Sequence, residues 1–181
     1  MPEITPHAPE TLTDEQRLAI AHLLKRVWPE NVGEPREMVE RLRGSDPLKP
    51  DWTIYVIWQG ERAVASAQTF ARKVSIDGEE RIVLALAGVC VDPDLRGSGM
   101  GADIVRLALA PVDDGRYELS LYQTGVPDFY CRLGACTVGN VFVNSHAEEP
   151  EQNPWWNDHV IVYPASAKWP AGKVDLLGPG Y

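Results

Sequence analysis

The N-terminal part of the chain carries apolar residues at helical spacing. Between Thr13 and Pro29 they recur three and four positions apart, as on one face of an amphipathic helix. Thr13 and Gln16 resemble the two partners of a capping box at the start of this helix. Residues 34–43 predict a second helix that ends at Gly44.

The pattern then changes to that of extended strands. Residues 52–58 and 63–76 are rich in β-branched and aromatic side chains. The pair Asp77-Gly78 is a strong hairpin signal ahead of residues 82–91, which are apolar at nearly every position. A run of this kind predicts a central strand covered on both faces, and Gly88 within it predicts a bulge or a close backbone approach.

The rest of the chain alternates helices and strands. The predicted order is a helix over 102–110 that stops at Pro111, a strand over 117–122, a short helix over 126–133, a strand over 137–143 and a last strand over 159–163. The stretch 145–181 is rich in proline and tryptophan, and too rich in proline to be a helix. These elements predict an α+β fold with a mixed, mostly antiparallel central sheet flanked by helices. With 181 residues, 44% of them hydrophobic, the chain 1–181 fits one domain.

A glycine-rich loop lies where the predicted central strand ends and the next helix begins. It reads Arg96-Gly97-Ser98-Gly99-Met100-Gly101. Glycines let successive backbone N–H groups converge on one point, and a helix start adds the positive end of its dipole there. The loop therefore predicts a pyrophosphate site, with a plain strand-to-helix turn as the alternative. NAD and ATP are poor candidates, because neither the dinucleotide fingerprint nor a closing Gly-Lys-Ser/Thr is present.

Residues 128–134 form a second segment with candidate chemistry. Phe129, Tyr130 and Leu133 have the spacing of a helix face that packs into the core, with Gly134 as the C-terminal cap. A tyrosine can bury its ring and still lend its hydroxyl to chemistry. Tyr130 is therefore a candidate catalytic residue.

Both segments resemble the GNAT superfamily of acyl-CoA N-acyltransferases. Arg96, Gly99 and Gly101 match its motif A, Gln/Arg-x-x-Gly-x-Gly/Ala, and residues 129–134 resemble the Phe-Tyr-x-x-Leu-Gly end of its motif B. The resemblance covers about residues 82–135, and elsewhere the order of elements agrees. It implies the GNAT fold, in which strands splay apart at the cofactor site.

The resemblance also implies an acetyl-CoA-dependent N-acetyltransferase that acts directly on the primary amine of a small acceptor. The pyrophosphate of acetyl-CoA would lie on the loop from Arg96 to Gly101. The main-chain groups of Val89, Cys90 and Val91 would pair with the pantetheine arm like an added strand. Tyr130 would assist the departing thiolate. The family's Asn-x-x-Ala is replaced by Gln-Thr-Gly-Val at 123–126, which puts one cofactor contact in doubt.

Direct transfer also requires a route for the proton of the amine. Glu118, at the start of the predicted strand 117–122, is the candidate base. Other candidates for this role are Glu79, Glu80, Asp92, His146 and His159. A different mechanism, in which Cys90 or Cys131 carries the acyl group, is less favoured because neither has a histidine nearby in the sequence.

The composition narrows the partners and the compartment. A net charge of −9 disfavours nucleic acid and favours a cationic acceptor, such as an aminoglycoside or a polyamine-like amine. Three cysteines form no disulfide framework and have no histidine at zinc-ligand spacing. Without a visible signal peptide or an apolar run of membrane-spanning length, we expect a cytoplasmic protein that binds neither membrane nor metal, with a homodimer as one option.

Two alternative functions stay open at this point, a transferase with a longer acyl donor and a non-catalytic acyl-CoA-binding sensor. The tail is loosely similar to that of the aminoglycoside 2′-N-acetyltransferase branch of the superfamily. Its tryptophans, Trp155, Trp156 and Trp169, either cover an apolar sheet edge or form a platform for a sugar.

Overall fold

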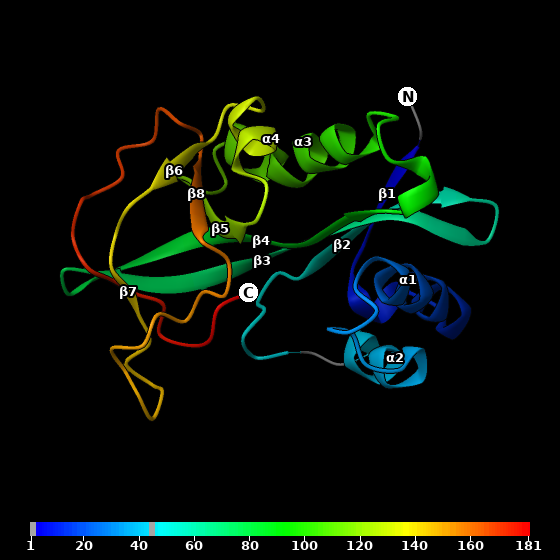
Figure 1. Cartoon of the computed structure of the whole chain (residues 1–181), viewed down its shortest axis with the longest axis horizontal. Coiled ribbons are helices and arrows are strands. Elements are labelled where there is room, and N and C mark those ends of the chain that lie inside the picture. Colours follow the sequence, from blue (N-terminus) through cyan, green and yellow to red (C-terminus); the bar gives the residue numbers. More distant parts are fainter. Residues whose placement is uncertain (1–2, 44–45) are drawn as a thin grey trace. The chain divides into compact units, whose positions relative to one another are not determined.

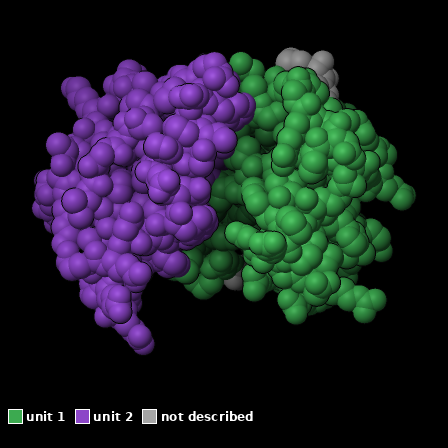
Figure 2. Space-filling view, in the orientation of Figure 1, with its two compact units in different colours: residues 1–70, 87–108 green, residues 71–86, 109–181 purple. Residues whose placement is uncertain are grey.

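The computed structural model describes residues 3–43 and 46–181, so that Gly44, the predicted end of the second helix, lies outside the described residues (Figure 1). The chain divides into two compact units (Figure 2). Unit 1 consists of Met1–Phe70 and Ala87–Ala108, and unit 2 of Ala71–Leu86 and Leu109–Tyr181. Two strands and one helix pass from one unit into the other along the chain, and a single domain over 1–181 stays a prediction.

The helices of unit 1 begin where the sequence predicts them. Helix α1 (Asp14–Val27) starts with a true capping box, in which the N–H of Gln16 donates to Thr13 Oγ1 at 3.3 Å and the N–H of Thr13 donates to Gln16 Oε1 at 2.9 Å. Helix α2 (Pro35–Arg43) follows. Both present a buried apolar side to the unit, with Ile20, Leu23, Leu24, Val39 and Leu42 almost inaccessible to solvent.

The strands of unit 1 form an antiparallel meander. Strand β2 (Thr53–Gln59) pairs with the edge strand β1 (Ile4–His7) and with β3 (Arg62–Ile76). Strand β4 (Glu79–Val91) follows β3 across the predicted Asp77-Gly78 turn, where both residues adopt positive φ. The predictions for β2, β3 and β4 are confirmed, whereas β1 was not predicted.

Unit 2 adds the parallel element that makes the sheet mixed. Strand β5 (Ser120–Thr124) pairs parallel with β4 at Leu84 and Ala85, and antiparallel with β8 (His159–Tyr163). Strand β6 (Cys136–Val138) lies antiparallel to β8. Two short strands, β7 (Phe142–Val143) and β9 (Val174–Asp175), pair in parallel, and β9 also pairs with the end of β3. The predicted mixed, mostly antiparallel sheet is confirmed.

Helix α3 (Met100–Asp113) continues past Pro111, so the prediction that Pro111 ends this helix was wrong. A proline removes only its own N–H from the helical ladder. The next turn is still closed, because the N–H of Asp114 donates to the carbonyl of Ala110 at 2.8 Å. Helix α4 (Pro127–Cys131) is shorter than predicted and is followed by Gly134 at φ 92°, the predicted C-terminal cap.

Three strand predictions in unit 2 were wrong. Strand β5 starts at Ser120 rather than at 117, because the N–H of Tyr117 is still bonded to the carbonyl of Pro111 after α3. The strand predicted over 137–143 is interrupted at Asn140, whose amide donates to the carbonyls of Pro170 and Gly172. Strand β8 is not the last, since β9 follows it.

The tail packs into the core of unit 2. Trp155 is 5% exposed and meets the rings of Phe142 and Tyr181 edge to face. Trp169 donates its indole N–H to Asn140 Oδ1 at 2.6 Å. Trp156 is 69% exposed. The covering role is thus met by Trp155, while Trp156 is left at the surface. Across the described part of the chain, no helix has the length and apolar character needed to cross a membrane.

Candidate functional site

The glycine-rich loop of unit 1 has the strand, loop and helix order that the sequence predicts. Strand β4 ends at Val91, a short 3-10 turn (Pro93–Leu95) follows, and α3 begins at Met100. Gly97 and Gly99 adopt φ values of 80° and 89°, a region that favours glycine. A side chain added at either glycine would meet nothing within 4 Å, so the space above the loop is open. Such a loop has room for a phosphate against the backbone.

Two sources of positive charge lie on this loop. Arg96 and Ser98 are exposed, and Ser98 uses its hydroxyl to donate to the carbonyl of Leu95 at 2.6 Å. The N–H groups of Ala102 and Asp103 both donate to the carbonyl of Gly99 and so close the first turn of α3. The helix N-terminus and the Arg96 guanidinium therefore place positive charge on the same short segment.

The predicted donor-binding segment Val89, Cys90 and Val91 forms the end of β4, and Gly88 precedes it. Gly88 has φ 60°, and a side chain there would lie 3.1 Å from Gln68 Nε2. The sequence predicts a bulge or a close backbone approach at Gly88, whereas the close neighbour here is the side chain of Gln68. Val89 and Val91 are partly exposed, whereas Cys90 is 4% exposed.

Burial of Cys90 bears on the covalent alternative. Burial raises the pKa of the Cys90 thiol to about 12, so the thiol is neutral at physiological pH. A neutral, inaccessible thiol is a poor nucleophile. Cys131 is exposed and Cys136 is partly exposed, and no cysteine of the described residues forms a disulfide. The described residues also contain no cluster of His, Cys, Asp and Glu that could hold a metal ion.

Asp92 anchors the start of the loop. Its carboxylate is completely buried and accepts hydrogen bonds from Arg62, from Arg26 at 3.0 Å and from the N–H of Asp94 at 3.1 Å. Burial alone would raise its pKa, but the Arg62 and Asp94 hydrogen bonds and the two guanidinium charges lower the pKa below the ordinary value. The Asp-Pro pair after a strand is an N-cap signal that could have identified the hydrogen bond to Asp94, but not the two arginines.

Tyr130 lies on α4 in unit 2 and is 6% exposed. Its ring packs edge to face against Tyr122, with centroids 5.0 Å apart, and against Phe129, with centroids 4.9 Å apart. Tyr122 belongs to β5, so the ring of Tyr130 is fixed against the sheet of its own unit. The predicted core role of Tyr130 is confirmed, and its catalytic role stays a prediction.

Glu118 lies in an exposed bend before β5, not in the strand. Glu118 therefore precedes β5, whereas Gln123 and the residues that lead to α4 lie at the opposite end of this strand. The remaining candidates for the base are surface groups as well: Glu79, Glu80, His146 and His159 are all exposed, and Glu80 pairs with Lys73 at 2.9 Å. Neither burial nor a cluster of titratable side chains therefore identifies one of these residues as the base.

Gln123 lies where the family pattern has an asparagine. Its side-chain amide links β5 to the backbone of the C-terminal tail. Its Oε1 accepts from the N–H groups of Trp156 at 3.0 Å and Asn157 at 2.8 Å, and its Nε2 donates to the carbonyl of Tyr181 at 2.9 Å. These contacts occupy the amide. No local pattern in the sequence indicates this structural role.

The strand, loop and helix of unit 1 and the mixed sheet have the arrangement of the GNAT fold. The chain belongs to the GNAT family, because the model of the acetyltransferase (GNAT) domain matches residues 9–138, well over half of its length. The match includes the loop and Tyr130, on which the resemblance rests. No curated protein matches the chain in sequence.

Solved structures agree on the fold. An acyl-CoA N-acyltransferase from Pseudomonas aeruginosa is 16% identical with a TM-score of 0.59, and Escherichia coli ElaA is 17% identical with a TM-score of 0.58. Each similarity covers 90% of this chain and 99% of the other. A GCN5-related N-acetyltransferase from Kribbella flavida is 20% identical with a TM-score of 0.56 over 76% of this chain, which spans only 34% of that longer protein. The predicted GNAT fold is confirmed, and the aminoglycoside branch is not.

Proposed function

We propose that this protein is an acetyl-CoA-dependent N-acetyltransferase that acts directly on a primary amine of a small, cationic acceptor. The observation that carries the proposal is the segment from Val89 to Gly101 in unit 1. There the end of β4, after Gly88 with its φ of 60°, leads into an open glycine loop that carries Arg96 and into a helix N-terminus. These are the parts needed to hold a pyrophosphate and an extended arm.

The donor would be held mainly by backbone groups. The loop N–H groups and Arg96 would bind the pyrophosphate, and the main chain of Val89, Cys90 and Val91 would pair with the pantetheine arm. One N–H of β4 would donate to the thioester oxygen and stabilise the negative charge that develops there during attack. Partial exposure of Val89 and Val91 supports this assignment.

Tyr130 is the proposed acid. The amine nitrogen bonds to the acyl carbon, the carbon–sulfur bond breaks, and the leaving sulfur accepts a proton from the Tyr130 hydroxyl. Because a thiol of this kind has a pKa of about 8.5, its thiolate is already a tolerable leaving group, and Tyr130 assists more than it enables.

The proton released by the amine passes to a base or to water. Glu118 remains our named candidate, and its exposure leaves it free to exchange protons with solvent. The conservative variant Glu118→Gln tests it, since a base would change the pH profile of kcat/KM whereas a surface glutamate would not.

The charge and the cysteines support the partner and the compartment that we propose. A net charge of −9 favours a cationic acceptor over nucleic acid. The described cysteines are free thiols, which is typical of proteins in a reducing cytoplasm. A homodimer stays a prediction.

Release of free thiol from acetyl-CoA tests the proposal. The purified chain would be assayed alone and with pools of polyamines, aminoglycosides, amino acids and short peptides. We expect one pool to raise thiol release well above the rate without acceptor. If no pool does, palmitoyl-CoA and octanoyl-CoA separate a longer acyl donor from a non-catalytic acyl-CoA sensor, which would bind without turnover.

A further inference from the structure

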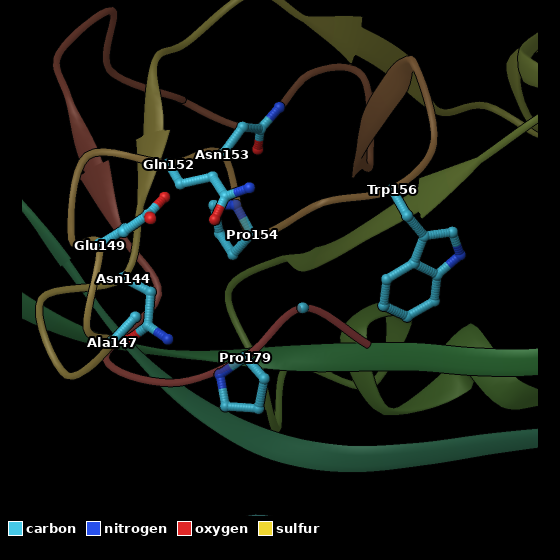
Figure 3. Close-up of a pocket in the computed structure, with 9 residues that line it drawn as sticks. Asn144, Ala147, Glu149, Gln152, Asn153, Pro154, Trp156 and Pro179 are labelled. Atoms are coloured by element: carbon cyan, nitrogen blue, oxygen red, sulfur yellow. The ribbon is translucent and has the colours of Figure 1, made fainter.

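An open pocket in unit 2 lies outside the residues assigned to the reaction (Figure 3). Its volume is about 300 Å³, and its walls come from the segment between β7 and β8 and from the segment after β9. The exposed indole of Trp156 lies on one side of Pro154 and Pro179, and Asn144 and Glu149 lie on the other. The aromatic and the charged groups of this pocket therefore do not meet on one small ligand.

A side-chain amide in unit 1, that of Gln68 on β3, does offer a ligand an oriented group. Its Oε1 accepts a hydrogen bond from the indole N–H of Trp52 at 3.1 Å. An indole N–H only donates, so the amide oxygen faces Trp52 and the NH₂ group points away from it. Gln68 is 9% exposed, and this NH₂ group has no hydrogen-bond partner among the described residues. Buried polar groups are nearly always paired, so an oriented donor without a partner indicates a ligand site.

Trp52 is itself fixed in place. It is 9% exposed, and the ammonium of Lys49 lies 4.2 Å from the centre of its ring. The same ammonium lies 5.5 Å from the centre of the Phe70 ring. These contacts hold the indole that orients the Gln68 amide. The amide therefore has its orientation before a ligand arrives, which is what lets a donor stabilise a transition state without reorganisation.

The amide of Gln68 lies over β4 at Gly88. A side chain at Gly88 would meet Gln68 Nε2 at 3.1 Å, Cδ at 3.6 Å and Cγ at 3.7 Å. Because glycine has no Cβ, the outer half of Gln68 occupies the space beside the β4 backbone at this position. Val89, Cys90 and Val91 follow directly, and they are the segment assigned to the pantetheine arm. The NH₂ group therefore lies at the start of the proposed donor-binding segment.

The direction of the donor brings its acyl group to this end of the segment. The pyrophosphate is assigned to the loop 96–101, and the arm would run from Val91 to Val89. The thioester, at the far end of the arm, would then lie next to Gly88. An NH₂ group needs a partner with a free lone pair. The attacking amine uses its own lone pair for the new bond, so the acyl oxygen is the better partner.

We propose that the NH₂ group of Gln68 is a second donor to the acyl oxygen, beside the N–H of β4. This inference rests on the proposed function, since it needs acyl-CoA to bind along β4. As the amine nitrogen bonds to the acyl carbon, the π electrons of the carbonyl group move onto the oxygen. They return when the carbon–sulfur bond breaks and the thiolate leaves. Gln68 keeps its protons throughout, and it binds the negative oxygen more tightly than the neutral one, which lowers the barrier.

Isotope-edited infrared spectroscopy of the full chain with acetyl-CoA, labelled with ¹³C at the carbonyl carbon, tests the proposal. A hydrogen bond to a carbonyl oxygen weakens the C=O bond and lowers its stretching frequency. Gln68→Met keeps the length of the side chain and removes the donor, so we expect a higher frequency for acetyl-CoA bound to this variant. The dissociation constant of acetyl-CoA should rise about two- to tenfold, whereas that of free coenzyme A, which lacks the acyl oxygen, should stay the same.

Turnover gives a second readout. Loss of one oxyanion donor lowers kcat by about 10²- to 10³-fold, and we expect the lower end for Gln68→Met because the N–H of β4 remains. KM for acetyl-CoA should change much less. Gln59→Met is the matched control, because Gln59 is exposed at the end of β2 in the same unit, and it should change none of these values. Circular dichroism would show that both variants are folded.

Trp52→Phe tests the orientation of the amide. Phenylalanine keeps an aromatic ring beside Lys49 but cannot donate to Gln68. The carbonyl frequency of bound acetyl-CoA should therefore move in the same direction as in Gln68→Met, by a smaller amount. This variant decides the question if Gln68→Met does not fold.

Two results would contradict the role of Gln68. One is an unchanged carbonyl frequency in the folded variants, even if kcat falls. The other is a fall in kcat that depends on the amine used, which would place the amide on the acceptor instead. Failure of the proposed function is distinct from both, because a wild-type chain that binds neither acetyl-CoA nor coenzyme A would contradict the donor site itself.

Discussion

The guanidinium of Arg26 donates a hydrogen bond of 3.0 Å to the buried carboxylate of Asp92 and so joins α1 to the end of β4 within unit 1. Arg62 of β3 donates to the other carboxylate oxygen. Arg96, the first residue of the glycine loop, comes four positions after Asp92. The cluster therefore fixes the backbone from which the predicted phosphate loop departs.

Replacement of Asp92 by asparagine should destabilise the protein. The new amide would keep the shape of the side chain but remove the buried charge that Arg62 and Arg26 share, leaving Arg26 only its exposed partner Asp94, at a cost of about 1–3 kcal/mol in the free energy of unfolding at pH 7. Urea denaturation measures this cost. Asp94→Asn is the control, because Asp94 also bonds Arg26 but its side chain is 76% exposed, and it should cost less than about 0.5 kcal/mol. Equal costs would contradict an anchoring role for Asp92.

The same cluster predicts a pH dependence. The pKa of Asp92 is lower in the folded protein than its ordinary value, so the folded state binds fewer protons than the unfolded state as the pH falls. The stabilisation is complete above the ordinary carboxyl pKa and is lost as the pH falls through the folded pKa. The difference in unfolding free energy between wild type and Asp92→Asn should therefore shrink below about pH 4. A difference that stays constant down to about pH 2 would refute this.

Gly88 should tolerate alanine less well than Gly60 does. Both have φ near 60°, and that conformation costs alanine about 1–2 kcal/mol. A side chain at Gly60 meets nothing within 4 Å, whereas one at Gly88 lies 3.1 Å from Gln68 Nε2, and Gln68 is itself held by the indole N–H of Trp52. We expect Gly88→Ala to cost about 1 kcal/mol more than Gly60→Ala. Equal melting temperatures for the two variants would show that the Gln68 side chain moves away from the added methyl group.

Tyr130→Phe should slow turnover without unfolding the protein. Loss of a general acid lowers kcat by about 10²- to 10⁴-fold, or less where the leaving group is good. The ring contacts with Tyr122 and Phe129 remain in the variant. Tyr122→Phe is the matched control, because the Tyr122 hydroxyl is buried without a hydrogen-bond partner among the described residues. If kcat is unchanged in Tyr130→Phe, Tyr130 is not the acid.

Arg96→Ala should weaken donor binding rather than chemistry. We expect KM for acetyl-CoA to rise about tenfold and kcat to change little, because the charge contacts a part of the donor that does not react. The rise should shrink at high salt. Arg36→Ala, an exposed arginine on α2, is the control. A fall in kcat at constant KM would place Arg96 in the reacting part of the site instead.

Local signals predicted most of the fold. The capping box at Thr13 and the positive-φ turn at Asp77-Gly78 depend on neighbours in the chain, and both are found. Strand β1 was missed because it is an edge strand with Pro6 inside it, which a central strand would not tolerate. Strand β9 is two residues long and depends on pairing with β7 and β3, which no local pattern shows.

The candidate site was predicted only where backbone geometry decides it. The positive φ values of Gly88, Gly97 and Gly99 follow from residues that permit this conformation. The burial of Asp92 and its two arginines could not be predicted, since Arg26 and Arg62 are far from it in the sequence. Glu118 was placed in a strand because the apolar pattern begins at 117, but a hydrogen bond back to Pro111 delays the strand.

The most direct test of the central claim is the identity of the product. The protein would be incubated with acetyl-CoA and the acceptor pool that raises thiol release, and the amines would be examined by mass spectrometry. We predict one N-acetylated amine, formed in equal amount to the free thiol and absent without enzyme. Thiol release without any acetylated amine would mean that the protein hydrolyses the thioester, and would contradict an N-acetyltransferase.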